Sequence, residues 1–183
     1  MRNVLSTGCS TGIGRATALR VARGEGTVYA SARQPATLDE LEAAGCKVLA
    51  LDVTSEDSMV AALAEIDGSV DVLINNAGYS QSGALETLPL SSVRRQFETN
   101  VFGLVRMCQL ALPAMRAAGR GRIINVSSMG GKLVFPGGGA YHASKHAVEA
   151  LSDALRYEVR GFGVRVVIIE PGPIITEWNE IAR

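Results

Sequence analysis

Short apolar runs alternate along the whole chain with longer segments whose apolar residues recur at helical spacing. The apolar runs predict six strands, near residues 3–6, 27–31, 47–51, 70–74, 122–126 and 164–169. Some of these runs are apolar on consecutive residues, as in VRVVII at 164–169, which is typical of strands covered by helices on both faces. The alternation therefore predicts a parallel sheet built from β-α-β units.

The segments of helical spacing predict helices near residues 13–23, 36–44, 56–66, 90–118 and 140–160. In the longest, apolar residues from Val93 to Met115 recur three and four positions apart. No repeat, linker or low-complexity tract interrupts this order. We expect one α/β domain over residues 1–183, a doubly wound parallel sheet of the Rossmann type that ends after its sixth strand.

Composition narrows the possible partners. Lys and Arg together number 18, as do Asp and Glu, so no overall charge favours nucleic acid or an anionic membrane surface. The longest apolar runs are far shorter than the ~20 residues that a membrane span requires, and no segment resembles a signal peptide. The three cysteines are scattered, which is typical of a reducing compartment. We expect a cytoplasmic protein with no nucleic-acid partner and no membrane span.

Three glycines, Gly8, Gly12 and Gly14, connect the first predicted strand to the first helix. Without Cβ atoms the backbone can approach a pyrophosphate, and the N–H groups of the helix N-terminus can bind the anion. The spacing G-x-x-x-G-x-G lacks the lysine of a P-loop, which disfavours a nucleoside triphosphatase. A turn that serves only packing is the alternative. Cys9, inside this loop, is interpreted as a small filler rather than a reactive thiol.

Arg33 stands at the end of the second predicted strand, and no carboxylate occurs between Glu25 and Asp39. In dinucleotide-binding folds an acidic residue here binds the ribose 2′-hydroxyl, whereas an arginine accommodates a 2′-phosphate. The sequence therefore favours NADP(H) over NAD(H) as cofactor. The alternative is that Arg33 is an ordinary solvated loop residue.

Tyr141 and Lys145 are four residues apart on a predicted helix, so they share a face. A free phenol titrates near pKa ~10, so proton transfer at neutral pH needs a pKa lowered by about 3 units. A neighbouring ammonium can lower it that far only in a site from which water is excluded. We expect Lys145 to lower the pKa of Tyr141. Simple packing of an aromatic ring against a lysine stem is the alternative.

Further polar residues stand where parallel strands end. Ser128 follows a strand thirteen residues before Tyr141, and its hydroxyl is a candidate to bind a substrate oxygen. Asn100 lies on the apolar stripe of the longest helix and needs a hydrogen-bond partner there. The motif NNAG at 75–78 supplies amides near the same sheet edge. For each of these, local hydrogen bonding in turns is the alternative.

His142 and His146 are also four residues apart, a spacing that can bind zinc. A catalytic zinc site needs a third protein ligand, and the chain has only two histidines, so we expect no metal. We interpret both histidines as residues of a packed or subunit-facing side of the helix.

The segments TGCSTGIG, LDV, NNAG, YHASK and PGPIIT, in this order, resemble the motifs of the short-chain dehydrogenase/reductase family over essentially the whole chain. The resemblance implies a catalytic tetrad of Asn100, Ser128, Tyr141 and Lys145. Tyr141 is then the general acid and base, Lys145 holds the nicotinamide ribose, Ser128 positions the carbonyl or hydroxyl, and Asn100 supports a water relay. The implied cofactor-binding residues are Gly8, Ser10, Thr11, Gly12, Ile13, Gly14, Arg33, Asp52, Val53, Asn76, Ala77, Gly78, Tyr141, Lys145, Pro171, Gly172, Ile174 and Thr176.

The loop sequences are similar to those of NADP-preferring members of this family, of the steroid, retinoid or carbonyl-reductase type. This implies hydride transfer to or from a small hydrophobic carbonyl or alcohol substrate, in a homodimer or homotetramer. Family members continue past the PGPIIT segment into a lid over the substrate, whereas this chain stops at Arg183. We expect either a piece of a longer protein or a site without a closed pocket. The competing hypothesis is a dinucleotide-binding regulatory or scaffold protein that turns nothing over.

Overall fold

The computed structural model describes residues 2–176, which form one parallel six-stranded sheet. The strands are β1 (Asn3–Ser6), β2 (Thr27–Ala32), β3 (Lys47–Ala50), β4 (Val72–Asn75), β5 (Gly121–Val126) and β6 (Val164–Ile169). Their order across the sheet is β3-β2-β1-β4-β5-β6, so the sheet grows outward in both directions from β1. This order confirms the doubly wound fold.

Helices connect the strands as the periodicity predicts. They are α1 (Gly12–Ala22), α2 (Asp39–Ala43), α3 (Glu56–Ala64), α4 (Leu90–Phe97), α5 (Gly103–Ala117) and α6 (Gly139–Val159). Short 3-10 turns lie at η1 (Pro35–Leu38), η3 (Met129–Gly131) and η4 (Arg160–Phe162).

The prediction of one continuous helix over 90–118 is wrong in one place. A π-helical turn, η2 (Glu98–Phe102), separates α4 from α5. Immediately after it Gly103 packs so closely on the loop after β3 that a Cβ there would lie 2.5 Å from the backbone oxygen of Val53. Tertiary contact of this kind is invisible to hydrophobic periodicity. Because π-turns recur at functional sites, η2 draws attention to its buried member Asn100.

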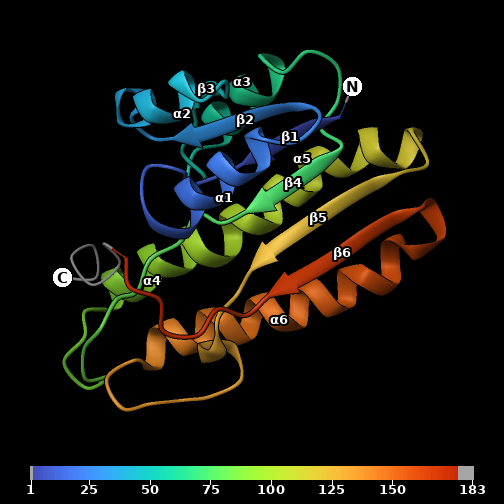
Figure 1. Cartoon of the computed structure of the whole chain (residues 1–183). Coiled ribbons are helices and arrows are strands. Elements are labelled where there is room, and N and C mark those ends of the chain that lie inside the picture. Colours follow the sequence, from blue (N-terminus) through green and yellow to red (C-terminus); the bar gives the residue numbers. More distant parts are fainter. Residues whose placement is uncertain (1, 177–183) are drawn as a thin grey trace.

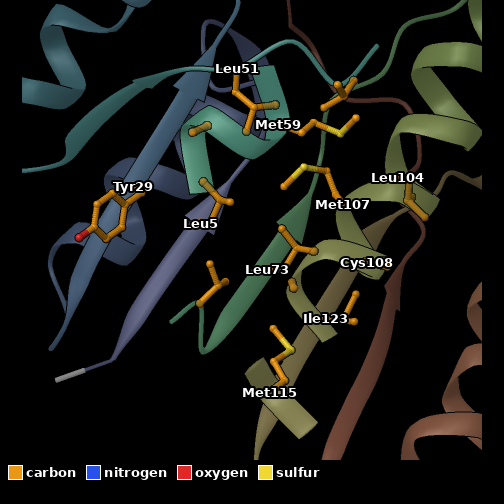
Figure 2. Packing of buried hydrophobic residues seen from close by; sticks show 14 of the residues in the cluster. Leu5, Tyr29, Leu51, Met59, Leu73, Leu104, Met107, Cys108, Met115 and Ile123 are labelled. Carbon is orange, nitrogen blue, oxygen red and sulfur yellow. The ribbon is translucent and has the colours of Figure 1, made fainter. Parts of the chain in front are cut away.

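Alternate residues of each strand enter two separate cores on the two faces of the sheet. On one face Leu5, Leu73 and Ile123 are fully buried against Met107 and Met115 of α5, as Figure 2 shows. This larger core also includes residues of α3 and α6, whereas the core on the other face is closed by α1 and α2. Burial on both faces explains why the strand sequences are apolar at consecutive positions.

All six strands run the same way, so their carboxyl ends meet at one edge of the sheet. Figure 1 shows the arrowheads of β4, β5 and β6 directed toward the side where α4 and the long loops lie. Ligand sites of open α/β sheets form outside this edge. Within the part of the chain that the structure describes, no helix combines the length and apolar character needed to cross a bilayer.

Candidate active site

A cavity of about 920 Å³ opens at the carboxyl edge of the sheet. Every cofactor-binding residue predicted from the sequence lines it, together with Ser128. The lining also includes residues that the sequence did not assign to the cofactor or catalytic site, namely Ala32, Leu51, Thr54, Tyr79, Arg95, Glu98, Thr99, Val126, Ser127, Met129, Gly130, His142 and Pro173. Segments spread over more than 160 residues of sequence therefore meet around one space.

The glycine loop forms one wall of the cavity because two of its glycines have no room for a side chain. Gly8 has φ +69°, and a Cβ on it would lie 2.8 Å from the Cα of Ala77. A Cβ on Gly14 would lie 2.2 Å from the backbone oxygen of Gly8. Helix α1 begins at Gly12, and the side chain of its N-cap residue Thr11 makes no capping hydrogen bond in the described part of the chain. This backbone cradle and helix N-terminus fit a pyrophosphate.

Cys9 points away from this chemistry. Its Sγ donates a hydrogen bond to the backbone oxygen of Ser6 at 3.2 Å, and its side chain is fully buried. Burial raises the pKa of the Cys9 thiol, so the thiolate is disfavoured. Cys9 thus fills space under the loop, in agreement with its interpretation from the sequence.

Thr7, which the sequence did not single out, ties the glycine loop to the NNAG turn. Its Oγ1 accepts hydrogen bonds of 3.1 Å from the backbone N–H groups of both Asn76 and Ala77. In return the Asn76 amide Nδ2 donates to the backbone oxygens of Thr7 at 3.0 Å and Gly8 at 2.9 Å. The two cofactor-side loops are therefore one rigid unit built at the ends of β1 and β4.

The adenine-side wall carries one cation and one carboxylate. Arg33 leaves the end of β2, is exposed, and forms no ion pair with any residue that the structure describes. The Asp52 carboxylate accepts from the backbone N–H of Thr54 at 2.9 Å and from its hydroxyl at 2.7 Å, so it shapes its own turn. The cation of this wall is therefore available to an anion, which fits the 2′-phosphate of NADP(H).

Ser128, Tyr141 and Lys145 meet at the opposite end of the cavity. Lys145 is almost fully buried, donates from Nζ to the backbone oxygen of Val126 at 2.8 Å, and lies 5.8 Å from the centroid of the Tyr141 ring. Ser128 begins η3, where its Oγ accepts from the N–H of Gly130 at 3.0 Å. The three polar groups thus surround one point at the carboxyl end of β5.

Burial shifts the pKa values of both Tyr141 and Lys145 in the polypeptide alone. Burial raises the pKa of the Tyr141 phenol, and a hydrogen bond with Ser128 opposes this rise. Burial also lowers the pKa of Lys145 to about 8, with the carboxylate of Glu149 opposing the shift. The lowering of the Tyr141 pKa by Lys145 stays a prediction for the site with cofactor bound, from which water is excluded.

Asn100 lies behind the cavity instead of lining it. The buried amide donates from Nδ2 to the backbone oxygen of Tyr79 at 2.9 Å and to the Ser144 hydroxyl at 3.1 Å, and its Oδ1 accepts from the N–H of Tyr79 at 3.0 Å. Ser144 directly precedes Lys145 in the sequence. Asn100 thereby connects η2 to α6 and to the loop after the NNAG turn.

His142 is buried on a packed side of α6, one of the two placements expected from the sequence, and it also lines the cavity. Its Nδ1 lies 3.1 Å from the backbone oxygen of Gly130, and its ring packs edge-on against Phe135 at 5.7 Å between centroids. A Cβ on Gly130 or Gly138 would come within 2.7 Å of the imidazole. Gly130 and Gly138, which both precede His142 in the sequence, leave room for this close approach.

Exposed apolar side chains, called the apolar border below, lie on two segments that contribute residues to the cavity lining. Val134 and Phe135 lie on the loop between η3 and α6, and Ile174 and Ile175 lie in the segment after β6. Ile175 is completely exposed and Val134 is 68% exposed. Of these four residues, Ile174 itself lines the cavity.

A doubly wound sheet with a glycine-walled cavity at its carboxyl edge defines a dinucleotide-binding α/β protein. Comparison with known proteins gives the family. The family model for short chain dehydrogenase matches residues 2–183, and the chain belongs to this family, whose members are oxidoreductases acting on CH–OH groups.

Individual relatives agree with this assignment. The chain is 41% identical to a 3-ketodihydrosphingosine reductase of Bacteroides thetaiotaomicron, over 97% of this chain and 65% of that protein. A crystal structure of a short-chain dehydrogenase from Streptomyces avermitilis is 41% identical with a TM-score of 0.92, over 100% of this chain and 69% of the other. A serine dehydrogenase complexed with NADP+ is 32% identical with a TM-score of 0.94, over 98% and 75%. The chain thus spans about two thirds of the length of the proteins it resembles.

Proposed function

We propose that the protein is an NADP(H)-dependent oxidoreductase that interconverts an alcohol and a ketone or aldehyde by hydride transfer. One observation carries this proposal: the phenol of Tyr141, the hydroxyl of Ser128 and the ammonium of Lys145 meet in the same cavity that the glycine loop walls at its other end. Proton-transfer groups and a pyrophosphate cradle in one space serve a reaction that moves a hydride and a proton together.

The chain's own groups divide the proton chemistry. When bound, the nicotinamide supplies the hydride for reduction or accepts it in oxidation. Tyr141 donates its phenolic proton to the carbonyl oxygen during reduction and takes the proton back from the alcohol during oxidation. Ser128 donates a hydrogen bond to the same oxygen, and the Lys145 ammonium stabilises the phenolate that Tyr141 becomes.

Arg33 supports NADP(H) over NAD(H). The exposed guanidinium offers a charge-assisted and possible bidentate contact that a 2′-phosphate uses and a 2′-hydroxyl does not. Relatives crystallised with NADP, a serine dehydrogenase and a gluconate 5-dehydrogenase of Burkholderia cenocepacia, support the same choice.

We propose a small hydrophobic carbonyl or alcohol compound as substrate. The apolar border at Val134, Phe135 and Ile174 supports this, as does the name of the related 3-ketodihydrosphingosine reductase. Exposed aromatic side chains at Phe102 of η2 and Tyr157 of α6 support a homodimer or homotetramer. Three cysteines that all remain buried free thiols support a cytoplasmic location.

The test is NADPH oxidation with a panel of hydrophobic ketones and aldehydes, compared with the variant Tyr141→Phe. We expect turnover by the native protein and a loss of about 10²- to 10⁴-fold in the variant, because the proton donor is gone. A fluorescence titration should show NADPH binding by both proteins, because the glycine-loop cradle is the same in both. NADPH binding without turnover above Tyr141→Phe on any substrate would establish the regulatory or scaffold alternative. Absence of NADPH binding would refute both.

A further inference from the structure

A buried carboxylate lies directly behind Lys145. Glu149 follows Lys145 by one turn of α6, on the same helical face, and is only 6% exposed. It packs against the segment after Ser128, where a Cβ on Gly131 would lie 2.9 Å from the Cγ of Glu149 and 2.8 Å from the Oγ of Ser127. Burying a carboxylate is costly unless cations compensate it, so its partners indicate its role.

One partner is on the surface. The Nζ of Lys132, in the first position after η3, lies 2.9 Å from Glu149 Oε2 and 3.5 Å from Glu170 Oε1. Lys132 is half exposed, and an ion pair with an exposed lysine contributes little to stability. The second oxygen, Oε1, is buried and has no hydrogen-bond partner among residues 2–176. A surface ion pair alone therefore does not account for the burial of Glu149.

The other cation is Lys145 itself. Its side chain is 4% exposed and its Nζ has one neutral acceptor, the Val126 oxygen. Burial lowers the pKa of Lys145 to about 8, and the charge of Glu149 raises it. The other ionisable groups around this pair are Tyr141 on α6, Lys132 after η3 and Glu170 after β6. Strand β5 contributes only uncharged groups, Val126 and the adjoining Ser127.

We propose that Glu149 is a positioning residue of the site: its carboxylate keeps the Lys145 ammonium charged and, through Lys132, fixes the segment after Ser128 to α6. The proposal rests on the function proposed above, in which a charged Lys145 holds the cofactor and stabilises the Tyr141 phenolate. Glu149 contacts neither, so it acts only through Lys145 and through the loop.

The decisive measurement is an NMR titration of lysine side chains labelled with carbon-13 at Cε, with the Lys145 signal assigned by its loss in Lys145→Met. In Glu149→Gln the midpoint of Lys145 should move about one pH unit lower, because a nearby negative charge is removed. In Lys132→Met it should move higher, because a neighbouring positive charge is removed. A merely structural role of Glu149 predicts the opposite for Glu149→Gln, since loosened packing would hydrate Lys145 and raise its midpoint toward ~10.5. A midpoint in Glu149→Gln that is unmoved or raised overturns the proposal.

Cofactor affinity gives a second readout. If only the charged form of Lys145 binds NADPH well, a midpoint lowered by one unit weakens apparent affinity about fivefold at pH 8 and hardly at all at pH 6. Glu149→Gln should show this pH-dependent loss, whereas uniform weakening at both pH values would contradict it. If Lys145→Met binds NADPH as the native protein does at every pH, the proposed role of Lys145 in cofactor binding fails. The NMR titration still decides on Glu149 in that case.

Discussion

Arg33 is the residue on which the choice of cofactor depends. We predict that Arg33→Ala weakens NADPH binding about 10- to 100-fold, the value of a lost charge-assisted hydrogen bond, while NADH affinity changes less than about threefold. Fluorescence titration with both cofactors measures this. Arg20→Ala is the matched control, because Arg20 is an exposed arginine of α1 that does not line the cavity. Equal weakening of both cofactors would mean that Arg33 does not contact the 2′-phosphate.

Among individual residues, most of the candidate site could be predicted from short sequence motifs, but the residues that support those motifs could not. Tyr141, Lys145 and Ser128 were found because their spacing on a helix and at a strand end has a direct geometric meaning. Thr7 and Glu149 were missed because each occupies a position ordinary for its type, a strand end and a helix interior. Only the fold shows that Thr7 binds the NNAG turn and that Glu149 is buried beside Lys145.

A variant of the glycine loop can distinguish the two explanations of its glycines, cofactor binding and simple packing. A Cβ on Gly14 would meet the Gly8 oxygen at 2.2 Å and the Asn76 amide at 2.4 Å, so Gly14→Ala must shift both cofactor-side loops. We predict a loss of about 1–3 kcal/mol in unfolding free energy from this strain. NADPH affinity should fall more than about tenfold, because the pyrophosphate loses its cradle.

The matched control is Gly161→Ala, since a Cβ there would meet nothing within 4 Å. It should change the unfolding free energy by less than about 0.5 kcal/mol. Urea denaturation and NADPH titration on both variants give the comparison. Gly14→Ala with native NADPH affinity would show that the loop does not hold the cofactor.

Hydrophobic periodicity predicted the strands and helices well, but it did not predict the break within a helix. Every strand lies within two residues of its predicted ends, because burial on both faces marks strands clearly. The break at η2 went unseen because Val93, Phe97, Val101 and Leu104 keep the helical period across it. Its causes are tertiary: the close approach of Gly103 to Val53 and the bonds of Asn100 to Tyr79. Neither contact can be predicted from the spacing of apolar residues.

Across the whole molecule, a buried polar chain joins the sheet to α5 and α6 next to the site. The amide of Asn75 on β4 donates to Cys108 Sγ of α5 at 3.3 Å and to Asn125 Oδ1 of β5 at 2.9 Å. Asn125 Nδ2 donates in turn to the Ser152 hydroxyl of α6 at 2.8 Å. Asn125 directly precedes Val126, whose carbonyl holds Lys145. These buried hydrogen bonds therefore fix the position of β5 relative to α6, the helix that carries Tyr141 and Lys145.

The variant Asn125→Leu tests whether these buried hydrogen bonds stabilise the fold. The substitution nearly preserves volume but removes two buried hydrogen bonds, which leaves the Asn75 amide with Cys108 Sγ and the Ser152 hydroxyl with the Val148 oxygen. We predict a loss of about 1–3 kcal/mol in the free energy of unfolding by urea, since each lost intramolecular hydrogen bond costs about 0.5–1.5 kcal/mol. Gln109→Ala, which removes only an exposed contact with Arg106, should cost less than about 0.5 kcal/mol. A loss in Asn125→Leu no larger than this control would mean that apolar packing alone positions β5 against α6.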